Sequence, residues 1–153
     1  MEEEKEISKS GQEYGKADVG KRIIAAIIDG LIGFVPALIP VIGGIAASAY
    51  LLTKDALPFI IAKNDEWKGK SVGKKLMGLK VIELNGQEID ILVSCKRNIT
   101  LAIGSISAIF IVLVVIGGPI QLILSIIELI LVITDLKGLR LGDRIANTQV
   151  VNA

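Results

Sequence analysis

The chain has 153 residues, of which 52% are hydrophobic and 4% aromatic, and its formal net charge is +1. Near-neutral charge with so few aromatic side chains argues against a nucleic-acid-binding surface. A single cysteine, Cys95, and the absence of histidine exclude an intrachain disulfide, a histidine-based zinc site and a Ser-His-Asp triad. We therefore expect no enzyme, no metal and no cofactor.

The N-terminal residues 1–19, "MEEEKEISKSGQEYGKADV", are acidic and polar. They lack the basic start and the short apolar core of a secretory signal. This composition predicts a flexible cytosolic tail. Residues 20–153 are predicted to form one membrane domain, a length that suits a single domain.

Two long apolar regions follow, at 23–62 and 99–134. A bilayer core about 30 Å thick is crossed by roughly 20 apolar helical residues, so each region has room for two passes. Proline and glycine break helices, and they occur in the middle of both regions, as "VPALIP" and "IGGP". The predicted fold is all-α, with four transmembrane helices in two hairpins, at about 21–36, 38–56 or 38–62, 98–117 and 119–136.

The distribution of positive charge predicts the orientation. All 17 lysines and arginines lie in the N-terminal, central and C-terminal segments or at Lys54, and neither predicted turn carries a charge. An even number of spans places the three charged segments on one side, which the positive-inside rule identifies as the cytosol. We expect a multi-pass protein of the cytoplasmic membrane with both termini in the cytosol.

The central segment predicts a small cytosolic β element at about 76–92, to which 147–152 would add a third strand. Asn85-Gly86 is a strong hairpin signal between two β-prone runs. The preceding stretch, 68–80, contains five lysines and three glycines. It is interpreted either as a site for anionic lipid headgroups or as a topology signal with glycine turns.

Ionisable residues inside predicted spans are functional candidates, because a charge is costly there. Asp29 lies eight positions inward from Lys21, and Glu128 lies nine positions inward from Lys137. Both depths are about 12–13 Å at 1.5 Å per residue. If the second span ends at Ala62, Lys54 lies at the same depth.

The partner of Asp29 distinguishes two hypotheses. Two adjacent carboxylates, Asp29 and Glu128, would share a proton or a cation. Pairing of Asp29 with Lys54 would instead indicate a structural clamp between helices. Both pairings are open at this point.

In their order along the chain, the motifs resemble the RDD family of prokaryotic membrane proteins over residues 17–151. Arg22 and Asp29 match the arginine and the first aspartate for which the family is named, and Asp55 or Asp143 is the second aspartate. "GKSVGKKLMGLKVIELNG" and "RLGDRIANTQVV" are similar to two further family segments. The resemblance also places these motif residues: Gly73, Lys74, Arg97, Asp143, Arg144 and Thr148.

The resemblance implies a multi-pass membrane protein without specifying one activity, because some members are associated with sodium–proton exchange and others with accessory roles. We expect a non-enzymatic interaction or regulatory module. The alternative is monovalent cation/proton transport that uses intramembrane carboxylates. The candidate residues for an ion or proton site or for a structural charge network are Arg22, Asp29, Lys54, Asp55 and Glu128. Expected partners are the bilayer and either another membrane protein or a second copy of the chain.

Overall fold

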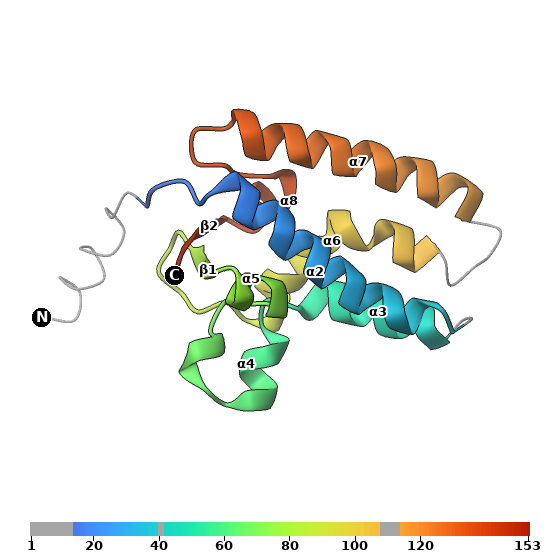
Figure 1. Cartoon of the computed structure of the whole chain (residues 1–153), viewed down its shortest axis with the longest axis horizontal. Coiled ribbons are helices and arrows are strands. Elements are labelled where there is room, and N and C mark those ends of the chain that lie inside the picture. The colour runs from blue at the N-terminus through green and yellow to red at the C-terminus, as the bar shows by residue number, and fades with distance from the viewer. Residues whose placement is uncertain (1–13, 40–41, 108–113) are drawn as a thin grey trace, which may run out of the picture.

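The computed structural model describes residues 14–39, 42–107 and 114–153, and most of them are helical (Figure 1). The long helices are α2 (Val19–Ala37), α3 (Ile42–Thr53), α6 (Ile91–Ser107) and α7 (Val114–Thr134). The shorter elements are α4 (Leu57–Ala62), the 3-10 helix η1 (Asp65–Trp67), α5 (Val72–Leu76), α8 (Leu141–Ile145) and the strands β1 (Leu79–Glu83) and β2 (Thr148–Asn152).

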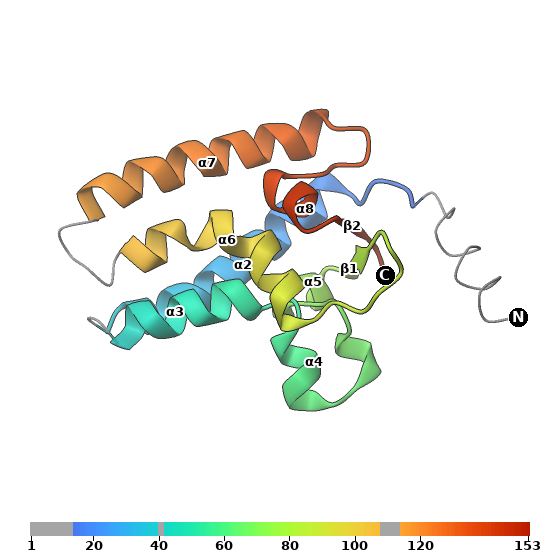
Figure 2. The same cartoon turned by 180° about the vertical axis from the view of Figure 1, so that it is seen from behind.

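The long helices lie side by side and alternate in direction along the chain (Figures 1 and 2). The start of α2, the end of α7, the two strands and the C-terminus gather at one end of the molecule (Figures 1 and 2). The end of α2 and the starts of α3 and α7 lie at the other end. Residues 1–13, which make up most of the predicted flexible tail, lie outside the described residues. Within 14–18, Ala17 is buried and Lys16 Nζ donates to the carbonyl oxygen of Ile133 over 2.8 Å.

The predicted break between the third and fourth spans is wrong in position. Gly117, Gly118 and Pro119 lie inside α7. A proline removes only one intrahelical hydrogen bond near the start of a helix, and an apolar segment offers the backbone no better partner than the helix itself. Pro36 likewise lies inside α2, one residue before its end.

Among the described residues, one helical segment, Val115–Thr134, is long and apolar enough to cross a membrane. α3 is a shorter apolar helix. Many large apolar side chains of the long helices are exposed, including Ile27, Leu31 and Phe34 on α2 and Ile123 on α7. Exposed apolar surface of this extent is typical of a face that contacts lipid or another protein.

The predicted β-hairpin is also wrong. β1 pairs directly and antiparallel with β2, and Val81 lies opposite Val150. The expected return strand instead leads into α6, where the Asp90 carboxylate accepts a hydrogen bond from the Val93 backbone N–H over 2.7 Å. A carboxylate that caps the first free N–H groups favours the helix over a strand at this point. The C-terminal strand, predicted as the third, is therefore the second of two.

The two strands belong to matching helix–strand units, which the sequence analysis did not detect. α5 and α8 each have five residues, and two positions after the end of each helix lies a residue with positive φ, Gly78 (φ 64°) and Asn147 (φ 51°). Each unit then continues into its strand. Because Val81 and Val150 hold equivalent places in the two units and pair with each other, an approximate twofold axis passes between them.

Each short helix packs closely on a long one through a glycine. A Cβ added at Gly73 of α5 would collide with the carbonyl oxygen of Ala25 in α2, and one added at Gly142 of α8 would collide with that of Arg97 in α6. Only glycine permits such close backbone approach. The two glycines therefore fix the units α5–β1 and α8–β2 onto α2 and α6.

Replacement of either glycine by alanine is expected to destabilise the protein by about 1–3 kcal/mol, because the backbones must separate. Gly118→Ala is the matched control, since nothing lies within 4 Å of an added Cβ there. Thermal unfolding in a non-ionic detergent measures the effect. Equal melting temperatures for Gly142→Ala and Gly118→Ala would contradict this packing.

Candidate functional site

The candidate site is a set of buried charged side chains where the short units meet the long helices. We call it the charge network. It consists of five cations and four carboxylates: Arg22, Lys54, Lys74, Arg97, Arg140, Asp29, Asp55, Glu128 and Asp143. Successive ion pairs connect all of them, from Lys54 at one end to Glu128 at the other.

Asp29 binds the α5 unit to α2. Its carboxylate accepts hydrogen bonds from Ser71 Oγ over 2.6 Å and from the Gly73 backbone N–H over 2.8 Å. Lys54 Nζ lies 3.4 Å from Oδ2, and Lys74 Nζ lies 3.9 Å from the same oxygen. The carboxylate is 1% exposed, so these partners replace the water that it would otherwise require.

Asp55 follows α3 and connects the two halves of the chain, which run from α2 to β1 and from α6 to β2. Lys74 Nζ donates to its Oδ1 over 2.6 Å, and Asn98 Nδ2 of α6 donates to its Oδ2 over 2.9 Å. Arg97 Nε lies 3.5 Å from the same Oδ2. The Asp55 backbone N–H donates to Ser94 Oγ, which adds a further link to α6.

Asp143 is surrounded by three arginines. Arg97 Nη2 donates to its Oδ1 over 2.7 Å, Arg22 Nη2 donates to its Oδ2 over 3.1 Å, and Arg140 Nε lies 3.4 Å from Oδ1. These arginines come from α6, from α2 and from the residue before α8. The Asp143 carboxylate is fully buried, and it holds three elements together.

Glu128 of α7 shares Arg140 with Asp143 and has further partners of its own. Its carboxylate accepts a hydrogen bond from Thr100 Oγ1 of α6, and Arg140 Nη1 lies 3.4 Å from Oε2. The Gly142 backbone N–H donates to Oε1 over 3.4 Å. The second glycine thus binds a buried carboxylate, as Gly73 binds Asp29.

The protonation of the groups outside the long helices follows from burial and from these ion pairs. Burial lowers the pKa of Lys74 to about 8, although Asp55 opposes the shift. Burial raises the pKa of Asp143, but Arg97, Arg140 and Arg22 outweigh it and hold the value below 3.8. Asp143 is therefore ionised at neutral pH.

A partly open cavity of about 380 Å³ adjoins the charge network. All five cations line it, together with Asp29 and Glu128. Apolar side chains of α2, α6, α7 and the two strands, together with Ser125, form the remaining walls. The cavity volume lies within the range of small-ligand sites.

The structure brings together most of the residues that the sequence singled out. Asp29 lies beside Lys54 and not beside Glu128, so of the two pairings considered it forms the clamp. Arg22 pairs with Asp143 across the sequence. Arg144 lies outside the charge network, where Nη2 is 2.9 Å from Asp135 Oδ2, and Thr148 is buried in β2 behind Asp143.

Sequence reasoning missed Arg140, Ser71, Asn98 and Thr100. The repeat of "SVGKKL" as "RLGDRI" could have identified Arg140, because it occupies in the second unit the place that Ser71 occupies in the first. No comparable pattern indicated the two polar side chains on α6.

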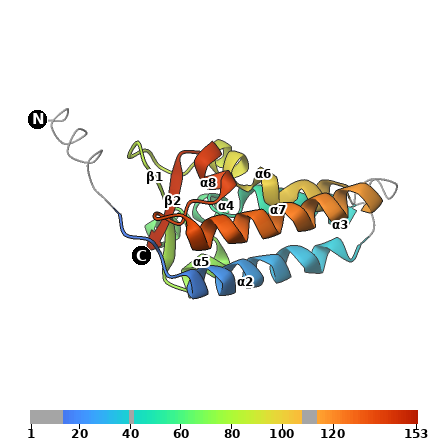
Figure 3. The same cartoon turned by 90° about the horizontal axis from the view of Figure 1, so that it is seen from above.

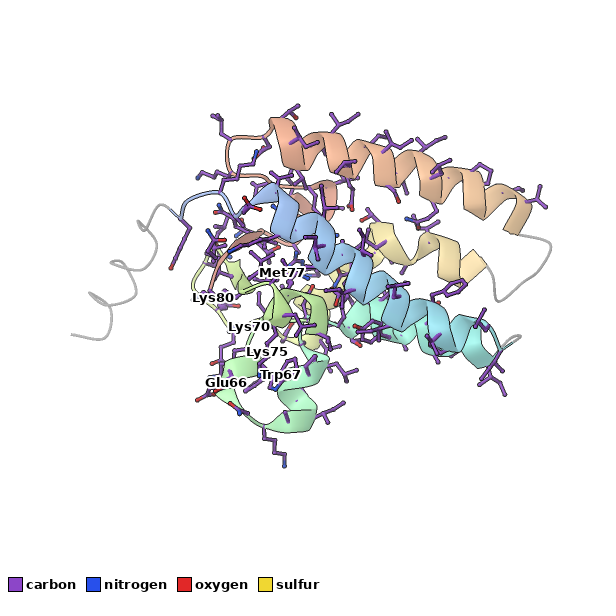
Figure 4. The ribbon with its side chains drawn as sticks, in the orientation of Figure 1. Glu66, Trp67, Lys70, Lys75, Met77 and Lys80 are labelled. Carbon is purple, nitrogen blue, oxygen red and sulfur yellow. The ribbon has the colours of Figure 1, made fainter. Side chains whose placement is uncertain are left out.

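The lysine-rich stretch divides between surface and interior. Lys74 is buried in the charge network, whereas Lys70, Lys75 and Lys80 lie along the α5–β1 side of the molecule (Figure 4). Lys75 Nζ lies over the Trp67 ring at 4.0 Å from its centroid, and 3.1 Å from Glu66 Oε2. Binding of anionic headgroups by these surface lysines remains a proposal.

The sequence of this chain matches the model of one protein family. The model of the RDD family matches residues 16–147, which is most of the chain. The chain belongs to the RDD family. No curated protein and no solved structure gave a match. RDD membership and the apolar helix α7 together indicate a membrane protein.

In this RDD protein, Asp143→Asn is expected to lower the free energy of unfolding by about 3–5 kcal/mol, because the change leaves buried arginines without a counter-charge. Asp65→Asn is the control, since the Asp65 side chain is 86% exposed and its change should cost less than about 1 kcal/mol. Unfolding of detergent-solubilised protein measures both. Similar losses in the two variants would refute a special role for Asp143.

The stability that Asp143 contributes should depend on pH in a defined direction. Its folded-state pKa lies below its ordinary value of 3.8, so the contribution is complete above about pH 4 and is lost as pH falls through the folded-state pKa. The observable is the difference in free energy of unfolding between wild type and Asp143→Asn. A difference that already declines between pH 7 and pH 5 would contradict the lowering of the Asp143 pKa by its three arginines.

Proposed function

We propose that the chain is a four-span protein of the cytoplasmic membrane that acts as a non-enzymatic interaction or regulatory module. α2, α3, α6 and α7 would be the spans, with the strands and both termini in the cytosol. The arrangement in Figure 1 supports this orientation, since the sheet, the start of α2 and the C-terminus share one end. The concentration of lysine and arginine near that end agrees with the positive-inside rule.

One observation carries the proposal: each carboxylate of the charge network is engaged by cations or by fixed donors. Asp29 is held by Lys54, and Asp143 by three arginines. In an exchanger, one carboxylate binds a proton and a sodium ion alternately, so it cannot stay paired with a cation of the protein throughout the cycle. Permanently paired carboxylates instead favour a rigid body that presents its surface to a partner.

Sodium–proton exchange is the second candidate, and one observation favours it. Asp29 and Glu128 both line the cavity, so a small cation that entered it could reach either carboxylate. The five cations along the same walls oppose this, because like charge disfavours a bound cation.

Reconstitution in liposomes separates the two functions. A sodium or pH gradient is imposed, and flux is compared for wild type, Asp29→Asn and the exposed-site control Asp65→Asn. We expect no flux above that of protein-free vesicles in any of the three. Flux in wild type and Asp65→Asn that disappears in Asp29→Asn would establish exchange in place of the proposed function.

A further inference from the structure

The approximate twofold relation between the two halves is broken at one contact. α2 packs on α3 as α6 packs on α7, and α3 packs closely on α6. The relation would require α7 to pack on α2 in the same way, but these two helices make no comparable contact in the described part of the chain. The cavity lies there, and residues of both helices line it. We call this site the α2–α7 cleft.

The inner end of the cleft is cationic. Arg22, Lys54, Lys74, Arg97 and Arg140 line it, and two of the four carboxylates, Asp55 and Asp143, do not. Asp29 and Glu128 are the acidic lining residues. Asp55 and Asp143 pair with these cations from behind the lining, and the five cations and four carboxylates of the charge network together still carry one net positive charge, which favours an anion.

Arg97 has unused hydrogen-bonding capacity at this end. Its side chain is buried, and Nη2 binds Asp143. Nη1 and Nε form no hydrogen bond with any described residue, although Nε lies 3.5 Å from Asp55 Oδ2. Buried guanidinium N–H groups normally have acceptors, so the N–H groups of Nη1 can donate to an additional anionic oxygen such as that of a phosphate.

The outer walls of the cleft are apolar. Ile23, Ala26 and Ile27 of α2 face Leu129 and Val132 of α7. Both helices also expose apolar side chains beyond the cleft. A free phosphate would leave these walls unfilled, whereas an acyl chain would cover them.

We propose that the α2–α7 cleft binds one anionic phospholipid, with its phosphate at Arg97 and the neighbouring arginines and an acyl chain between α2 and α7. The start of α2 and the end of α7 lie together at the sheet end of the molecule (Figure 3), which places the phosphate at the cytosolic interface in the proposed orientation. The site does not depend on whether the chain is an interaction module or an exchanger.

Binding can be blocked without altering a charge. Ala26 is exposed on α2 and lines the cleft, so Ala26→Phe should fill the space for the acyl chain. Ala46→Phe is the matched control, because Ala46 is exposed on α3 and does not line the cleft. The full chain is purified in a non-ionic detergent and titrated with dioleoyl phosphatidylglycerol, dioleoyl phosphatidylcholine or inorganic phosphate.

Native mass spectrometry counts bound lipid, and thermal unfolding reports its effect. We expect one phosphatidylglycerol per chain and a raised melting temperature for wild type and Ala46→Phe, with at least tenfold weaker binding to Ala26→Phe. Phosphatidylcholine or inorganic phosphate binding as strongly as phosphatidylglycerol would overturn the proposal. Unchanged binding to Ala26→Phe would also overturn it, as would a dimer that Ala26→Phe dissociates, since a second copy would then occupy the cleft.

Discussion

The ion pairs of Arg97 are the interaction on which the rest of the structure depends. This buried guanidinium lies on α6 and joins Asp55, which follows α3, to Asp143 in α8. An unpaired buried charge costs several kcal/mol, so the elements that carry these carboxylates must stay in register with α6. Asp55 extends the link to Lys74, and Asp143 extends it to Arg22. The two halves of the chain are thus held together near the sheet by these ion pairs as well as by the pairing of β1 with β2.

The glycine contacts make this geometry possible. Gly73 and Gly142 let α5 and α8 touch the backbones of α2 and α6, which brings Lys74 and Asp143 inward as equivalent residues of opposite charge. Their backbone N–H groups also bind Asp29 and Glu128. The same matching units would give a closed four-helix arrangement, yet α2 and α7 remain apart beside the cavity. The gap between α2 and α7 fits a binding function better than it fits a requirement for stability, because packing these helices together would bury more apolar surface.

Some of this was predictable from the sequence. Apolar runs predicted the long helices, and equal depth grouped Asp29 with Glu128. Lys54 joined this group only if the second span ran to Ala62, but α3 ends at Thr53, and Lys54 reaches Asp29 from the turn that follows. The partner of Asp29 could not be predicted, because helix rotation decides which side chains face each other. The β-hairpin failed because Asn85-Gly86 is a local signal, whereas Leu79–Glu83 pairs with a strand far along the chain. Gly-Gly-Pro failed as a break because surroundings that provide no water favour helix continuity.

A double-mutant cycle tests the central claim, that permanent ion pairs hold the halves together. Arg22→Met, Asp143→Asn and the double variant are unfolded in mixed micelles alongside wild type. Because Arg22 Nη2 of α2 lies 3.1 Å from Asp143 Oδ2 of α8 in a buried setting, the two changes should be strongly non-additive, with a coupling free energy of about 1–3 kcal/mol. Additive losses within about 0.5 kcal/mol would show that this pair does not act as a clamp, and would contradict the account.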